Sequence, residues 1–200
     1  LALIIEKTQL YKGVKLNKQL IAQNKSLEQR VSHDALTGLY NRPAIFDILY
    51  KQILRAKRGG LIIALIMIDI DHFKAINDTC GHLTGDAVLC EIAERLRKSA
   101  RSHEYIGRYG GEEFLIIVSP YDQEGAIKAA ERFREAIACK EISANKRQVP
   151  ATISLGVAVS AGEDTLDAHL LLQKADEALY QAKRMGRNRV ELADMKKISE

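Results

Sequence analysis

The feature that most restricts the fold of this chain is an uninterrupted apolar run, Leu61–Ile68, followed at once by Asp69-Ile70-Asp71. A strand with one solvated face alternates apolar and polar residues, whereas a continuous apolar run is typical of a strand buried on both faces. The run is also far shorter than the roughly 20 residues that a membrane-spanning helix needs. We therefore expect a central strand in a sheet that is covered by helices.

Helical and strand patterns alternate along the rest of the chain. Apolar residues at helical spacing predict helices that begin near Pro43, Thr84, Asp122 and Thr165, and Asp122 and Thr165 can cap theirs. Short apolar segments between turn residues predict strands over 105–108, 114–118, 150–160 and 189–192. The predicted fold class is an α/β sandwich in which helices flank a mostly antiparallel central sheet.

The composition suits one globular domain with an appendage. The chain has 200 residues, of which 46% are hydrophobic and 28% charged, and its net charge of +4 is too small to indicate a nucleic-acid partner. Cys80, Cys90 and Cys139 lack the spacing of a disulfide framework or a zinc site. A reducing compartment, the cytoplasm, is the expected location, and no secretory signal is visible.

Residues 1–31 form the predicted appendage, and the domain proper covers 32–200. The positions that recur every seven residues in the appendage are Leu3, Leu10, Asn17, Asn24 and Val31. This pattern predicts a signalling helix that forms an imperfect coiled coil, in which buried Asn would fix a two-stranded register; a solvated linker helix is the alternative. Because the chain begins without Met, we expect a larger protein, with membrane association only through the missing upstream region.

Two carboxylates follow the predicted central strand. Side chains alternate along a strand, so Asp69 and Asp71 are expected on the same face, where they repel each other unless a cation compensates them. Carboxylate oxygens suit Mg²⁺ or Mn²⁺, which usually bridge to substrate phosphates. A solvated strand end without a ligand is the alternative.

A glycine hairpin carries two further acids. In Arg108-Tyr109-Gly110-Gly111-Glu112-Glu113-Phe114 the glycines allow a sharp turn and a close approach of the backbone to a ligand. If this hairpin pairs with the strand of Asp69, three or four carboxylates converge, which is a common way to hold metal against a nucleoside triphosphate. Taken alone, the segment is equally consistent with a surface turn.

Two polar segments supply candidate nucleotide contacts. Asn77 and Asp86 lie at the edge of a predicted loop before a helix. They offer an amide and a carboxylate that can read the polar edge of guanine, although Asp86 also suits the start of a helix. Lys183 and Arg187 lie at the end of the last predicted helix, where they can grip phosphate or complement the helix dipole.

Five segments together resemble the GGDEF domain of diguanylate cyclases. They occur in family order and cover about residues 32–192. They are DALTGLYNR, DIDHFKAINDTCGHLTGD, RYGGEEF, TISLGVAV and ADEALYQAKRMGRNRV. The resemblance implies a fold like the polymerase palm and the class III nucleotidyl cyclases, and an enzyme that joins two GTP molecules into cyclic di-GMP.

The resemblance also assigns a metal site to this chain. Asp69, the backbone carbonyl of Ile70 and Glu112 would ligate Mg²⁺ or Mn²⁺. Glu113 would be a further ligand or the base that assists the attacking 3′-hydroxyl. Glu112 and Glu113 are therefore the candidate catalytic residues.

The substrate contacts follow from the same resemblance. Guanine would be bound by Asn77 and Asp86, with His82 nearby. The residues expected at the phosphates are His72 and Phe73 through their backbone, Lys74, and, for the terminal phosphates, Lys183 and Arg187. Each domain would bind one GTP, so two domains must meet as a homodimer, which gives the N-terminal helix a purpose.

The chain departs from the family pattern at two positions. Glu112 stands where the family name has Asp, which keeps the carboxylate. Arg101-Ser102-His103-Glu104 occupies the place of the inhibitory product-binding RxxD motif, and Glu104 carries its carboxylate one methylene further out than Asp would. We expect weak or absent feedback inhibition. The alternatives to an active cyclase are a catalytically silent binding module and a different nucleotidyl cyclase or palm enzyme.

Overall fold

The computed structural model describes residues 31–119, 122–160 and 167–195, so nearly all of the predicted N-terminal helix lies outside the described residues. Its centre is a five-stranded sheet with the strand order β2-β3-β1-β6-β7. These strands are β1 (Ala64–Ile70), β2 (Glu104–Gly110), β3 (Glu113–Val118), β6 (Ile153–Val159) and β7 (Val190–Leu192). Among the strand pairs of this sheet in the described residues, β6–β7 is parallel and the other three are antiparallel, which confirms the predicted, mostly antiparallel sheet.

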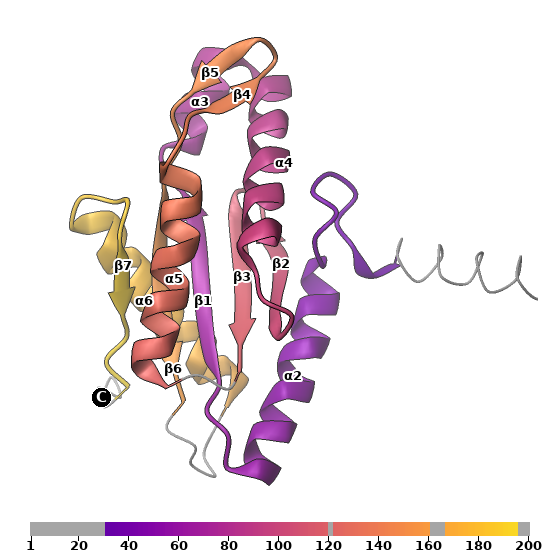
Figure 1. Cartoon of the computed structure of the whole chain (residues 1–200), viewed down its shortest axis with the longest axis vertical. Coiled ribbons are helices and arrows are strands. Elements are labelled where there is room, and N and C mark those ends of the chain that lie inside the picture. Colours follow the sequence, from indigo (N-terminus) through magenta and orange to yellow (C-terminus); the bar gives the residue numbers. More distant parts are fainter. Residues whose placement is uncertain (1–30, 120–121, 161–166, 196–200) are drawn as a thin grey trace, which may run out of the picture.

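Helices cover both faces of this sheet (Figure 1). Their bounds are α2 (Arg42–Gly59), α3 (Phe73–Cys80), α4 (His82–Ser99), α5 (Gln123–Ala138) and α6 (Ala168–Arg184). A small hairpin of β4 (Ile142–Ala144) and β5 (Arg147–Val149) forms a separate two-stranded sheet. The arrangement is the predicted α/β sandwich.

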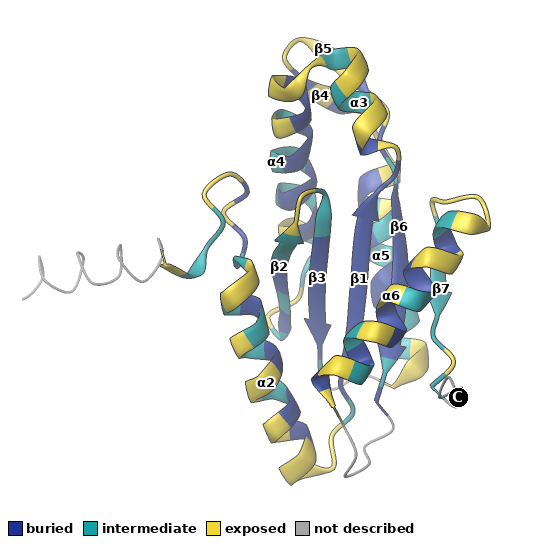
Figure 2. Ribbon diagram, turned by 180° about the vertical axis from the view of Figure 1, so that it is seen from behind, coloured by how far each residue is buried: buried dark blue, intermediate teal, exposed yellow. Residues whose placement is uncertain are grey.

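The central strand β1 supplies both halves of the core. All seven of its residues are buried, because alternate side chains pack on opposite faces. Ile66 and Ile68 join the cluster formed with α4 and α5, whereas Leu65 and Met67 join the cluster formed with α2 and α6. Figure 2 shows the buried sheet between partly exposed helices.

Local signals in the sequence explain several element boundaries. Asn41 caps α2 by accepting a hydrogen bond from the backbone N–H of Ala44, with Pro43 in the first turn. Asp122 caps α5 as predicted. The cap of α6 is Asp167; the predicted cap, Thr165, lies outside the described residues.

Two predicted details were wrong, and one element was not predicted. β1 begins at Ala64, three residues later than predicted, and it includes Asp69 and Ile70. The segment around Asn77 is a helix, α3, and not a loop. The β4–β5 hairpin was not predicted, because strands of three residues leave almost no periodic pattern.

Two further findings concern membrane spans and cysteines. No helix in the described ranges is long and apolar enough to cross a membrane. Cys80, Cys90 and Cys139 are all free thiols.

Candidate metal and nucleotide site

The register between β1 and β3 brings two of the predicted acids together. Asp69 lies directly opposite Glu113 in this antiparallel pair. The backbone N–H of Ile70 donates to the carbonyl of Glu112 at 3.3 Å, which ties the hairpin to the end of the central strand. The structure therefore confirms that the glycine hairpin pairs beside the strand of Asp69.

Lys183 faces the same carboxylate from α6. Its Nζ lies 2.7 Å from Oδ2 of Asp69, and the two side chains are 32% and 12% exposed. Helix α6 approaches the sheet closely because Gly156 in β6 has no side chain; a Cβ there would collide with the backbone of Ala175 and Leu179. The close packing places the last turn of α6 over the end of β1.

The surroundings shift both facing acids toward protonation. Burial raises the pKa of Asp69, the ion pair with Lys183 lowers it, and the nearby charges of Glu112 and Asp71 raise it. Burial also raises the pKa of Glu113, and the charge of Asp69 adds to that effect. Two acids this close favour a cation between them, because it would relieve their mutual repulsion.

Asp71 does not share this role. It is buried, and it accepts hydrogen bonds from the hydroxyls of Thr152 and Ser154 at 2.6 Å each and from the backbone N–H of Asn188 at 3.0 Å. These contacts fasten β6 and the loop after α6 to the end of β1. Asp71 is a structural anchor, which leaves Asp69, Glu112 and Glu113 as the acids of this edge.

The donor set fits a hard divalent cation. Asp69, Glu112, Glu113 and the carbonyl of Ile70 offer only oxygen ligands, as Mg²⁺ prefers. A cation, the Lys183 ammonium, already stands against Asp69. In the described part of the chain, no three His, Cys, Asp or Glu side chains lie close enough together to hold a metal ion. The predicted convergence of three or four carboxylates was therefore wrong for the structure without a bound metal.

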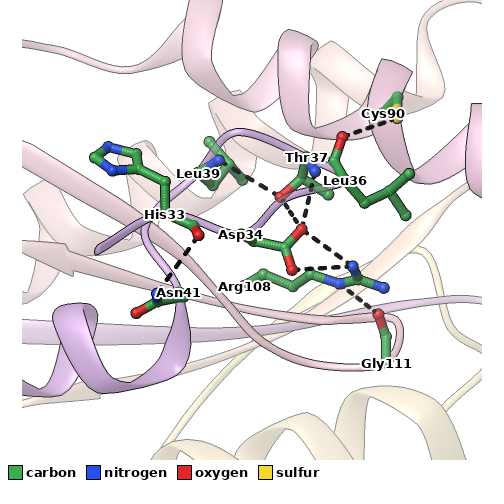
Figure 3. A network of polar contacts seen from close by, with 9 residues as sticks. All are labelled: His33, Asp34, Leu36, Thr37, Leu39, Asn41, Cys90, Arg108 and Gly111. Carbon is green, nitrogen blue, oxygen red and sulfur yellow. Dashed lines mark hydrogen bonds and ion pairs between the residues drawn. The ribbon is translucent and has the colours of Figure 1, made fainter. Parts of the chain in front are cut away.

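Arg108 of β2 links the two-glycine turn to Asp34, which lies outside the sheet (Figure 3). Gly111 has a φ of 53°, and the β2–β3 register shifts between Arg108 and Gly110. Nε of Arg108 donates to the carbonyl of Gly111 at 3.0 Å, and Nη1 donates to the carboxylate of Asp34. Asp34 also accepts hydrogen bonds from the backbone N–H and the hydroxyl of Thr37.

The predicted guanine residues lie on two consecutive helices. Asn77 is in α3, and His82 and Asp86 are in the first turns of α4, both exposed. The side-chain amide of Asn77 packs against Gly85, where a Cβ atom would collide with it. Gly85 thus allows Asn77 to sit beside the start of α4, a role that the sequence analysis missed.

The predicted phosphate residues lie in two regions, one around the start of α3 and one around the end of α6. His72 is exposed, has a φ of 57° and precedes α3, whose first residue, Phe73, is buried, while Lys74 is exposed. Arg187 is exposed and has a φ of 62° in the loop after α6.

Glu104, the candidate inhibitory residue, is buried and paired with Arg132. Its side chain is 0% exposed, and both carboxylate oxygens accept hydrogen bonds from Nη2 of Arg132, at 2.6 and 2.7 Å. One oxygen also accepts the backbone N–H of Arg101 at 2.7 Å. Arg132 lies 28 residues further along the chain, so no local pattern pointed to it.

The fold and the site define a class of protein: an α/β sandwich in which a glycine hairpin sets glutamates beside an aspartate of the central strand. The sequence profile of the family described as "Diguanylate cyclase, GGDEF domain" matches residues 31–189. The chain belongs to this family.

Curated relatives share much of the sequence. The chain is 39% identical over 180 residues to diguanylate cyclase DosC of Escherichia coli K12, which covers 87% of this chain and 39% of that protein. It is 44% identical over 168 residues to the response regulator PleD of Caulobacter vibrioides NA1000, covering 82% and 36%. The chain thus spans well under half the length of these relatives.

Solved structures share the fold. The coiled coil and GGDEF domain of DgcB from Caulobacter crescentus, in complex with c-di-GMP, matches with a TM-score of 0.82 and 32% identity, over 94% of this chain and 98% of that one. The diguanylate cyclase SiaD from Pseudomonas aeruginosa, in complex with its activator SiaC, matches with a TM-score of 0.80 and 31% identity, over 94% and 71%.

Proposed function

We propose that this GGDEF domain is a diguanylate cyclase, the output domain of a larger bacterial signalling protein. It condenses two GTP molecules into cyclic di-GMP and releases two pyrophosphates. The observation that carries the proposal is the cross-strand pair of Asp69 and Glu113 beside the two-glycine turn. Family membership and the named cyclases among the relatives support the same activity.

The metal site comprises Asp69, the carbonyl of Ile70, Glu112 and Glu113. A Mg²⁺ or Mn²⁺ ion bound there would polarise the α-phosphate and activate the 3′-hydroxyl. The strand pair holds Asp69 and Glu113 in fixed positions, so the charge of the site is preorganised. Glu113, whose pKa is raised by burial, serves as a ligand or accepts the proton of the 3′-hydroxyl.

The nucleotide lies across the end of the sheet. Asn77 and Asp86 bind the guanine edge, with His82 nearby. The backbone at His72 and Phe73 contacts the phosphates. The side chains that bind the phosphates are Lys74, Lys183 and Arg187.

Catalysis requires two copies of the domain. Each copy offers one nucleotide site, and the product contains two nucleotides joined by two phosphodiester bonds. In a homodimer each 3′-oxygen attacks the α-phosphorus of the other GTP, and pyrophosphate leaves from each. We therefore expect the rate per subunit to rise with protein concentration. Size-exclusion chromatography over the same concentrations should show the dimer forming.

The central test replaces Glu113 with Gln. The full chain is incubated with GTP and Mg²⁺, the product is identified by mass spectrometry, and GTP binding is measured by equilibrium dialysis. We expect Glu113→Gln to lose turnover by at least about a hundredfold, the usual scale of a general base, while it still binds GTP. Glu135→Gln is the matched control, because Glu135 is 71% exposed on α5, and its rate should equal that of the wild type.

Other outcomes would identify the alternatives. An unchanged rate in Glu113→Gln contradicts the assigned chemistry. GTP binding without any product indicates a silent binding module. A cyclic product from ATP at a similar rate indicates another nucleotidyl cyclase and removes the guanine-reading role of Asn77 and Asp86.

A further inference from the structure

We propose that Lys183 is a built-in counter-ion of the metal site: its ammonium neutralises Asp69 in the nucleotide-free domain and moves away when nucleotide phosphates attract it. Divalent metal and nucleotide then bind with positive coupling. The nucleotide part of this inference rests on the proposed function, whereas the competition between Lys183 and metal does not.

The two members of the pair differ in mobility. Asp69 is fixed within β1, paired with Glu113 on one side and Ser154 on the other. Lys183 extends from the last turn of α6 and remains 32% exposed. A lysine ammonium is a compact charge on a flexible stem, so the ammonium can leave while the carboxylate stays.

The ion pair with Lys183 stabilises the charged form of Asp69 in the nucleotide-free domain. The Asp69 side chain is 12% exposed, and it lies close to the charges of Glu112 and Asp71. A carboxylate in such surroundings is costly without a compensating cation. In the described part of the chain, Lys183 is the one cation that forms an ion pair with Asp69.

Competition follows from the shared oxygen. Nζ of Lys183 lies 2.7 Å from Oδ2 of Asp69, and a divalent ion bound to that oxygen would occupy the same space. Metal must therefore displace the ammonium, which weakens metal binding to the free domain. Phosphates that attract Lys183 release the oxygen, and by linkage metal strengthens nucleotide binding by the same factor.

The test measures metal binding without turnover. Mn²⁺ is titrated into the full chain, and the free ion is followed by electron paramagnetic resonance. We expect Lys183→Met to bind Mn²⁺ about tenfold more tightly than the wild type without nucleotide, a change of about 1.4 kcal/mol. Adding 3′-deoxyGTP, which lacks the attacking hydroxyl, should tighten Mn²⁺ binding in the wild type and much less in Lys183→Met.

Three further variants make the result specific. Arg184→Met removes the same charge one residue further along, where the guanidinium lies over the ring of Tyr180, and it should leave the Mn²⁺ affinity within about twofold of the wild type, the effect expected of a screened surface charge. Lys183→Arg keeps the cation and should keep the weak binding. Asp69→Asn should abolish Mn²⁺ binding both in the wild type and in Lys183→Met. This result would show that the Mn²⁺ measured in the titration is bound at Asp69.

Several outcomes would overturn the inference. It fails if Lys183→Met binds Mn²⁺ no more tightly than the wild type, or if Arg184→Met tightens binding equally. Circular dichroism confirms that each variant is folded, and if Lys183→Met does not fold, Lys183→Gln takes its place. If Lys183→Met binds Mn²⁺ more tightly but the wild type forms no cyclic di-GMP, the proposed function alone is contradicted. If the wild type makes cyclic di-GMP but Lys183→Met binds Mn²⁺ with unchanged affinity, this inference alone is contradicted.

Discussion

Arg108 donates hydrogen bonds to both carboxylate oxygens of Asp34, at 3.1 and 3.3 Å, across 74 residues of sequence. The same guanidinium donates to the carbonyl of Gly111 at 3.0 Å. The backbone reinforces this link, because the N–H of Arg108 donates to the carbonyl of Tyr40 at 2.8 Å. The segment that enters the domain is thereby joined to the turn that carries Glu112 and Glu113.

Replacing Arg108 with Lys should lower cyclase activity while the domain stays folded. Lys keeps the charge but cannot donate to Asp34 and Gly111 at the same time, because it lacks the fork of the guanidinium. We expect the rate to fall by about tenfold, which corresponds to about 1.4 kcal/mol of lost positioning of the turn. Steady-state kinetics, with the melting temperature as a check of folding, measures this.

A double-mutant cycle with Asp34→Asn shows whether the two residues act as one unit. Asp34→Asn alone should also slow the enzyme, and it should add little in the Arg108→Lys background. Fully additive losses would mean that the two residues affect the turn independently.

The stability of the domain should depend on Asp34 at acidic pH. Partial burial acts to raise the pKa of Asp34, but hydrogen bonds from Thr37 and the Arg108 guanidinium outweigh it and leave the pKa lowered. A lowered pKa in the folded state stabilises the fold above the unfolded value, near 3.8, and this contribution is lost as the pH falls through the folded value.

Urea unfolding of the wild type and of Asp34→Asn between about pH 7 and pH 3 checks the sign of this effect. The difference in the free energy of unfolding should stay constant at neutral pH and shrink below about pH 4. A difference that grows as the pH falls would contradict the assigned direction.

Gly85→Ala should impair GTP binding without destabilising the domain. A methyl group there would displace the amide of Asn77, whereas Ala within a helix is favoured over Gly by up to about 1 kcal/mol. We expect at least a tenfold loss of GTP affinity, about 1.4 kcal/mol, with an unchanged or higher melting temperature. In an Asn77→Ala background the same substitution should have little further effect, and a large additional loss would show that Gly85 acts by another route.

The sequence predicted the parts of the site that depend on neighbouring residues and on one strand pair. The apolar run before Asp69 and the glycines before Glu112 required a central strand and a hairpin, and the structure pairs them as predicted. Helix α3 was missed, because it has only eight residues and buries only Phe73, which leaves little helical pattern to detect.

Long-range partners could not be predicted in this way. Asp71 lies two residues after Asp69, on the same face of the predicted strand, so the sequence alone makes it an equally good candidate metal ligand. Its role is determined instead by distant hydroxyl groups, such as that of Thr152, 81 residues further along the chain. The position of Lys183 against Asp69 depends on how closely α6 packs on β6, which a glycine in the sequence does not reveal by itself. The sequence thus indicates which side chains have the chemistry of a ligand. Tertiary packing determines which of these side chains are free to bind one.

Feedback inhibition by cyclic di-GMP should be weak or absent. The carboxylate of Glu104 is fully buried, and both of its oxygens are engaged by Arg132. Binding a ligand there would require breaking this pair inside the protein, which leaves a buried charge uncompensated. The initial rate with added cyclic di-GMP tests this directly, and sub-micromolar inhibition would contradict it.

Glu104→Asp tests the physical reason for that expectation. The shorter side chain cannot reach Arg132 in the same geometry, so the guanidinium and the carboxylate should become available to the product. We expect calorimetry to detect cyclic di-GMP binding at least about tenfold tighter than in the wild type, about 1.4 kcal/mol. Glu131→Asp on α5, whose side chain is 41% exposed, is the matched control and should not change product binding. If Glu104→Asp remains insensitive to the product, the ion pair with Arg132 is not what closes the site.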